Sequence, residues 1–358
     1  MDAPSQPSPP TAGAPDAPAA PEPAWAGARD EELLAMRVCD LGVRIDGSEL
    51  EPRIAQLHDE LRARGIGLQP ACYLGDEWFT PSEQAIIAIP FWLAHPRLKA
   101  LELRQVLEVE GGTPEHCMQL LRHECGHALD HAYRFSRRRR WRQLFGNTDN
   151  DATPDIYRPR PYSKSFVRHL PNWYAQAHPD EDFAETFAVW LGVPERQWRT
   201  RYRGWKALDK LEYVNELMVE AAALRPPQVR APARRIADAA RMRKTLARYY
   251  AERRKNYAED YPDVYDTDLR AIFGGEASEE SAARWLRRAR KTIVPSIVRW
   301  TGEHKYTVDH LVRRLTMRCE RLGLVAPQNQ SRLTMDVSAY VAALVTNHLH
   351  TGRFKRSV

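Results

Sequence analysis

Residues 122–132 read RHECGHALDHA, which sets two histidines and a glutamate at a spacing that can bind a metal ion. Residues four apart share one face of a helix, so His123 and His127 would both reach one zinc ion through imidazole nitrogens. Glu124 would point beside that ion and take a proton from an activated water as the water attacks a carbonyl group. The competing interpretation is a solvated helix face with ordinary histidines.

A zinc site of this kind needs a third protein ligand. His131 continues the same face but lies a further turn along the axis, about 6 Å away, so we expect it beside the site or at the surface. The metzincin spacing would require a glycine six and a histidine ten residues after His123. This chain has Leu129 and Tyr133 at those positions, which excludes that pattern.

A better source of the ligand is the segment HPDEDFAETFAVWL at 178–191. Glu181 and Glu185 are four residues apart and share a helix face with two alanines, which would allow close packing against the histidine helix. We predict that Glu181 binds zinc and that Glu185 accepts the free ring N–H of a ligand histidine. The opposite assignment of the two glutamates stays open, as does ordinary core packing with solvated carboxylates.

The two motifs together, HECGH at 123–127 and EDFAETFA at 181–188, resemble the gluzincin branch of zinc metallopeptidases. The second stretch is particularly similar to a bacterial family described as "putative zinc-binding metallopeptidases". The resemblance covers roughly residues 113–220. It implies a zincin-like domain, a zinc cofactor and peptide or protein substrates. It also implies that the first acid of the second motif, Glu181, is the metal ligand.

Tyr174, seven residues before Glu181, is the candidate for stabilising the oxyanion of a tetrahedral intermediate. A tyrosine at a similar offset occurs in some gluzincins. The alternative is that Tyr174 is a packed aromatic residue beside Trp173.

The patterns around these motifs predict an α+β fold that is mainly α. Thr113 and Pro114 are typical of a helix start, so we expect a long helix from about 114 into the 130s. Residues 31–65 are expected to form a strand and then a helix, and two short strands are expected within 67–93, on either side of a Thr-Pro-Ser turn at 80–82. The strand at 84–92 is predicted to be an edge strand that could pair with an extended substrate. The polar segment 146–172 would cover or line the cleft, and helices would follow residue 234.

The composition predicts three regions: a disordered Pro/Ala-rich tail at 1–29, a zincin-like metallopeptidase domain at 30–230, and a basic helical region at 231–358. The longest apolar run, residues 85–94, is about half the length that crosses a bilayer, so we expect no membrane association. The N-terminus lacks the pattern of a secretory signal. Five scattered cysteines without a C-x-x-C pair favour a reducing, cytoplasmic location.

The net charge of +6 is unevenly distributed. From Arg234 to the end, 25 Lys and Arg stand against 14 Asp and Glu, a balance of +11, which leaves −5 for the preceding residues. An acidic partner such as nucleic acid is therefore one candidate for the C-terminal third. Our main hypothesis is zinc-dependent hydrolysis of peptide bonds with Glu124 as general base. The alternative is a nucleic-acid-associated binding protein whose zincin-like domain is regulatory or catalytically silent.

Overall fold

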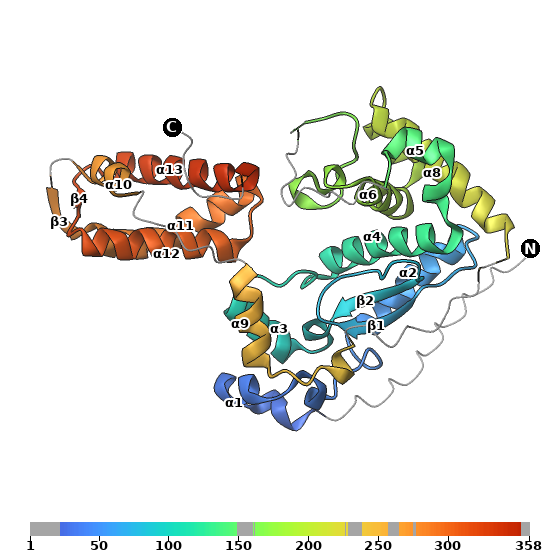
Figure 1. Ribbon diagram of the computed structural model, residues 1–358, viewed down its shortest axis with the longest axis horizontal. Helices are drawn as coiled ribbons and strands as arrows, with labels where there is room; N and C mark the ends of the chain where they lie inside the picture. Colours follow the sequence, from blue (N-terminus) through green and yellow to red (C-terminus); the bar gives the residue numbers. More distant parts are fainter. Residues whose placement is uncertain are drawn as a thin grey trace, which may run out of the picture.

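The computed structural model describes residues 22–148, 160, 162–225, 227, 238–256, 265–274 and 277–351. The described chain is mainly helical with two small sheets, which confirms the predicted α+β class (Figure 1). The longer helices are α2 (Leu50–Ala63), α3 (Pro96–Val106), α4 (Pro114–Tyr133), α6 (Pro179–Gly192), α8 (Lys206–Ala223), α9 (Leu246–Asn256), α11 (Ala282–Thr301), α12 (Lys305–Arg321) and α13 (Gln330–Thr351). The shorter helices are α1 (Asp30–Ala35), α5 (Arg139–Phe145), α7 (Glu195–Arg201) and α10 (Asp266–Ile272). The strands are β1 (Ala71–Gly75), β2 (Ile86–Pro90), β3 (Ala277–Ser281) and β4 (Val325–Pro327).

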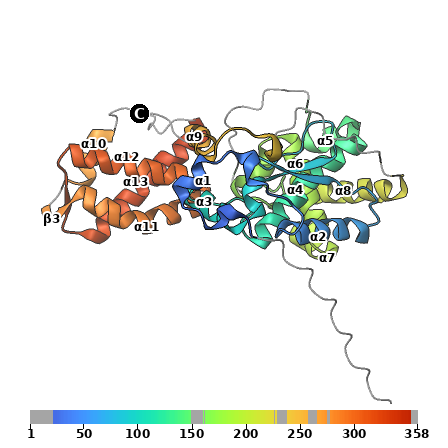
Figure 2. The same ribbon diagram turned by 90° about the horizontal axis from the view of Figure 1, so that it is seen from below.

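Buried hydrophobic side chains form two separate clusters. The first runs from Trp25 to Tyr250 and the second from Tyr265 to Val345. Figures 1 and 2 both show the second set of helices, α10 to α13, lying to one side of the rest. We call the two parts the N-terminal lobe and the C-terminal bundle. The three predicted regions stay predictions: most of the tail lies outside the described residues, and Trp25, near its end, is buried in the first cluster.

Helix α4 is the central element of the N-terminal lobe. It begins as predicted, because the Thr113 side chain accepts a hydrogen bond from the N–H of His116 and Pro114 occupies the first turn. It ends at Arg134, which adopts a left-handed conformation. On one side α4 faces α2 and the β1–β2 sheet, and on the other it packs extensively against α6 (Figure 1).

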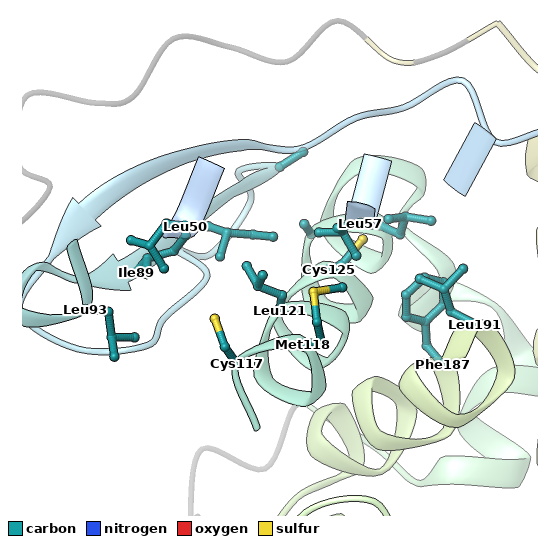
Figure 3. Close-up of a cluster of buried hydrophobic side chains, with 14 of the residues drawn as sticks. Leu50, Leu57, Ile89, Leu93, Cys117, Met118, Leu121, Cys125, Phe187 and Leu191 are labelled. Carbon is teal, nitrogen blue, oxygen red and sulfur yellow. The ribbon is translucent and has the colours of Figure 1, made fainter. Parts of the chain in front are cut away.

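Apolar side chains fix α4 in this position. Figure 3 shows residues of α2, β2 and α6 converging on it. The side chains labelled there are Leu50, Leu57, Ile89, Leu93, Cys117, Met118, Leu121, Cys125, Phe187 and Leu191, all of which belong to the first cluster. Because α4 is packed on both sides, its side chains lie at fixed distances from those of the neighbouring elements.

The small sheet differs from the prediction in two respects. Residues 31–49, expected to include a strand, instead contain α1 and a 3₁₀ turn at Val38–Leu41. Strands β1 and β2 pair in parallel, with Tyr73 opposite Ala88. On the other side of β2, Phe79 pairs with Ala88 in an antiparallel bridge, with N–O distances of 3.4 and 2.8 Å. The prediction of an edge strand at 84–92 is therefore wrong: β2 is the middle strand, and all five of its residues are buried. The exposed edge belongs to the segment around Phe79.

The C-terminal bundle is built from three long helices. Helices α11 and α12 are joined by a short turn and pack along one another, α13 packs against both, and strands β3 and β4 pair antiparallel at one end. The bundle is linked to the N-terminal lobe through Glu108, in the segment that precedes α4. Its Oε1 lies 2.6 Å from His304 Nδ1, and its Oε2 accepts a hydrogen bond from the N–H of Lys305 at 3.3 Å.

Within the described part of the chain, no helix is both long enough and apolar enough to cross a membrane. Of the predicted cleft segment 146–172, residues 149–159 and 161 lie outside the described residues.

Candidate metal centre

Three side chains from α4 and α6 converge on one point. The Oε2 atom of Glu181 lies 3.0 Å from His123 Nε2 and 3.2 Å from His127 Nε2, and the two Nε2 atoms are 3.2 Å apart. These residues form a group that could hold a metal ion. His123 is buried and the other two are partly buried, so the group can be reached from solvent on one side.

The spacing of the three donor atoms fits zinc. Ligand atoms about 2.0–2.1 Å from a tetrahedral zinc ion are separated by about 3.3 Å along each edge of the tetrahedron. The observed separations of 3.0–3.2 Å are close to that edge. Two imidazole nitrogens and one carboxylate oxygen are also a donor set that zinc accepts, with a fourth position left for water or substrate.

Glu185 lies on the other side of the His123 ring. Its Oε1 is 2.9 Å from His123 Nδ1, and its Oε2 accepts a hydrogen bond from the N–H of Leu170 at 2.8 Å. Since Nδ1 faces Glu185 and Nε2 faces Glu181, the two glutamates contact opposite nitrogens of one ring. A carboxylate at Nδ1 fixes the tautomer that leaves Nε2 free to bind a metal.

Without a metal ion, the electrostatics of the group favour an ionised Glu181 next to protonated imidazoles, and a metal ion that binds there displaces those protons. Burial raises the pKa of Glu181, but hydrogen bonds with His123 and His127 outweigh it and hold that pKa well below its usual range. Burial lowers the pKa of both histidines, and the neighbouring glutamates outweigh it and raise both values. A carboxylate that stays ionised is a suitable ligand for a divalent cation.

Close packing of α4 and α6 makes this convergence possible. A Cβ atom added at Gly126 would lie 2.8 Å from the Cα of Ala184, closer than side-chain carbons normally approach backbone. Gly126 therefore lets the two helices approach, as a glycine at a helix contact allows. The alanine at 184 gives the matching small surface on α6.

Glu124 follows the first histidine and is buried. Its Oε2 lies 2.8 Å from the Thr80 hydroxyl, which also lies 3.0 Å from the Glu124 carbonyl oxygen. Thr80 is in the segment that connects β1 to β2, and it is 6% exposed. Sequence reasoning interpreted Thr80 only as part of a Thr-Pro-Ser turn, so this contact was missed.

Tyr174 lies near the group, within a 3₁₀ turn over Pro171–Gln176. Its ring centroid is 5.7 Å from that of His123, and 37% of the residue is exposed. Tyr174 is thus partly exposed and lies beside a candidate ligand histidine. Trp173, its neighbour in sequence, adopts a positive φ of 54°, a conformation in which a non-glycine residue is uncommon.

His131 lies outside the group. Its Nδ1 is 3.3 Å from the carbonyl oxygen of Gln84, so it contacts the β1–β2 connection rather than the donor atoms. That His131 does not share the ion stays a prediction.

Comparison with known proteins gives one match, to part of the N-terminal lobe. Residues 116–231 match the family model described as "Putative zinc-binding metallo-peptidase". The predicted resemblance to a zinc-binding metallopeptidase family is thereby confirmed, with zinc as the cofactor that the family name and the donor set both indicate. The match includes all of α6 and all of α4 except its first two residues, and the C-terminal bundle lies outside it. No curated protein and no solved structure matches the chain.

A second buried polar pair lies beside the site and was also missed. The carboxylate of Asp182, on α6, forms an ion pair with Lys210 on α8, and both side chains are buried. Burial raises the pKa of Asp182 to about 7, and Lys210 acts against that shift. A lysine 28 residues downstream of an acidic segment gives no sequence signal for such a contact. The pair connects the helix of Glu181 to α8.

Proposed function

We propose that this protein is a zinc-dependent peptidase of gluzincin type, in which His123, His127 and Glu181 hold the metal. The single observation that supports this most is the spacing of the three donor atoms, 3.0–3.2 Å, within a segment that matches a zinc-binding metallopeptidase family. Glu185 would orient His123 through Nδ1. A zinc ion bound there would polarise a substrate carbonyl and lower the pKa of water to about 7.

The chain's own residues have distinct tasks in this proposal. The carboxylate of Glu124, next to the first histidine, accepts a proton from the attacking water and later passes it to the leaving amine. Tyr174, half-exposed beside His123, donates a hydrogen bond to the oxygen that becomes negative as the carbonyl is attacked. The metal ligands themselves transfer no proton.

The substrate would approach along the segment around Phe79. Because Phe79 exchanges its backbone hydrogen bonds with Ala88, the backbone groups of Trp78 and Thr80 point away from β2. An extended peptide could pair with that edge, next to Glu124. This replaces β2, which is covered on both sides, as the candidate strand for substrate binding.

Zinc content and hydrolysis together test the proposal. Purified wild type should hold one zinc ion per chain, as measured by inductively coupled plasma mass spectrometry. His123→Ala and Glu181→Ala should each lose most of this zinc, because each removes one of the three protein ligands. Glu124→Gln should keep zinc and lower the hydrolysis of a fluorogenic peptide library by at least about 100-fold. Full zinc in both alanine variants, or unchanged hydrolysis by Glu124→Gln, would contradict the assignment.

The acidic partner suggested for the C-terminal third stays a prediction. Much of the positive charge of the bundle is paired internally, as in Arg287 with Glu320, Arg288 with Glu280 and Arg318 with Asp266. These pairs reduce the charge available to a nucleic acid. We therefore keep hydrolysis as the leading function.

A further inference from the structure

We infer that Thr80 is a positioning residue for Glu124, holding the carboxylate in the orientation that proton transfer requires. The inference rests on the proposed function, in which Glu124 is the general base. Thr80 lies 43 positions before His123 and outside the matched segment 116–231. Neither the family match nor the two motifs point to it.

The hydroxyl of Thr80 has two acceptors within reach, the Oε2 and the carbonyl oxygen of Glu124. A hydroxyl has one proton to donate, so only one of the contacts takes it at a time. The carbonyl already belongs to the hydrogen-bond ladder in the interior of α4. The carboxylate at 2.8 Å is the stronger acceptor, because a hydrogen bond to an ionised oxygen is stronger than one to a neutral oxygen.

Thr80 itself is held in place from two directions. Its neighbour Phe79 pairs with Ala88 of β2, and the next residue, Pro81, limits the backbone of Thr80 to extended conformations. Four residues on, the Gln84 carbonyl lies 3.3 Å from His131 Nδ1, on the same helix as Glu124. The hydroxyl therefore belongs to a segment anchored to both the sheet and α4, so it can define where Glu124 Oε2 lies.

The orientation has a chemical consequence. A carboxylate has two oxygens, and Thr80 engages Oε2. Proton uptake is then the task of the other oxygen, Oε1, and the contact between Thr80 and Oε2 fixes the orientation of Oε1. Without the hydroxyl the carboxylate can rotate about its terminal torsion, which is broad for glutamate. Loss of Thr80 should then slow the proton transfer and leave the metal ligands in place.

The variants that test this are Thr80→Val, which keeps the shape and removes the hydroxyl, and Thr80→Ser, which keeps the hydroxyl. The matched control is Thr316→Val in the bundle, where a buried threonine donates to the carbonyl of Val312 at 2.7 Å. Zinc content, thermal stability and the kinetics on one fluorogenic peptide cleaved by wild type are measured for each.

We expect Thr80→Val to keep full zinc and an unchanged KM, with kcat lower by about tenfold, which corresponds to roughly 1.4 kcal/mol. Thr80→Ser should recover kcat to within about threefold of wild type, and Thr316→Val should match wild type. Equal kcat for Thr80→Val and Thr316→Val would overturn the inference. So would a loss of zinc in Thr80→Val, or a kcat for Thr80→Ser as low as that of Thr80→Val, since either would make the role purely structural.

A second readout does not depend on hydrolysis. Acetohydroxamate is a small zinc chelator, and its hydroxyl should hydrogen-bond to the Glu124 carboxylate when it binds the metal. Its affinity for the zinc-loaded protein should therefore fall about tenfold in Thr80→Val and in Glu124→Gln. Unchanged affinity in Thr80→Val with reduced affinity in Glu124→Gln would overturn the inference alone. Absence of zinc in wild type would overturn the proposed function and this inference with it. Wild type that holds zinc but cleaves no peptide would overturn only the proposed function, and the affinities would decide on Thr80.

Discussion

The N-terminal lobe and the C-terminal bundle are both helical, but their buried charged groups have different partners. Between α4, α6 and α8 the structure buries two carboxylates, Asp182 and Glu185, that are each about 1% exposed, together with His123 and Lys210. In the bundle, Glu303 and Asp309 are buried acids, and Asp309 is paired with Arg290 and Arg313, whose side chains reach solvent. The bundle core between its helices is made of aliphatic and aromatic residues.

The difference indicates which part of the molecule is built for chemistry. Burying a charged group costs free energy unless partners compensate for it, so such groups persist where they have a task. In the N-terminal lobe each of them has a specific partner, and the partners connect the metal donors to α8 and to Leu170. The bundle shows the ordinary pattern, with apolar residues inside and ion pairs near the surface.

Removing one partner of the buried ion pair should give the largest effect on stability. Lys210→Met leaves the Asp182 carboxylate buried without its cation, and we expect the free energy of unfolding of the N-terminal lobe to fall by about 3–5 kcal/mol. The matched change in the bundle is Arg313→Met, at a pair whose arginine is half-exposed, and it should cost less than about 1 kcal/mol. Urea unfolding of both variants measures the two values. Similar losses of unfolding free energy would mean that the N-terminal lobe and the C-terminal bundle do not differ in how strongly their ion pairs contribute to stability.

A change at the contact between α4 and α6 should have an intermediate effect. In Gly126→Ala the new Cβ meets the Cα of Ala184, so the helices must separate, at a cost of about 1–3 kcal/mol in unfolding free energy. Zinc affinity should fall as well, because two donors are on α4 and one is on α6. Gly192→Ala is the control, since the nearest atoms to its Cβ would belong to the side chain of Arg122 and not to the backbone of another helix. Stability and competition with a zinc chelator would be compared; equal affinities in the two variants would contradict the role of Gly126.

The smallest effect is expected where the two lobes meet. The hydrogen bond with Glu108 raises the pKa of His304, with help from the charges of Glu303 and Glu110. Burial raises the pKa of Glu108, but His304 outweighs it and the net shift is downward. The contribution of His304 to folding stability is therefore complete below pH 6.5, and it is lost as the pH rises through the pKa of the folded state. The contribution of Glu108 is complete above pH 4.5 and is lost as the pH falls below that value.

The stabilisation by this contact should therefore be greatest between about pH 4.5 and 6.5, and should decrease by at most about 1 kcal/mol towards pH 9, because both side chains are partly exposed. Thermal unfolding of wild type and His304→Gln at pH 6 and pH 9 measures it. The difference between the two proteins should shrink at pH 9. A difference that grows with pH would show that the sign is wrong.

Much of the helical framework was predictable because its signals are local. Thr113 and Pro114 mark the start of α4, and His178, Pro179 and Gly192 mark both ends of α6. The pairing of Glu181 with the two histidines was also predictable in outline, since residues four apart share a helix face. What the motif could not supply was the distance between the two helices, which depends on Gly126 meeting Ala184.

The remaining features depend on contacts between residues far apart in the sequence. Pro90 suggested an edge strand, yet β2 pairs on its second side with Phe79. Phe79 lies in the connection between β1 and β2, and no periodic pattern in the sequence predicts that it pairs with β2. Thr80 looked like a turn residue because Thr-Pro is common in turns. Lys210 looked like a surface lysine, since lysine is almost never fully buried unless it is paired.

The two hydrophobic clusters have a consequence for how the molecule melts. Each has its own aliphatic and aromatic core, and the described contacts at Glu108 that join them are polar and partly exposed. Cooperative all-or-none unfolding requires that the parts lose their structure together, and a weak polar junction does not enforce that. We therefore expect two unfolding transitions, one for the N-terminal lobe and one for the C-terminal bundle, and we expect zinc to raise the midpoint temperature of the first alone.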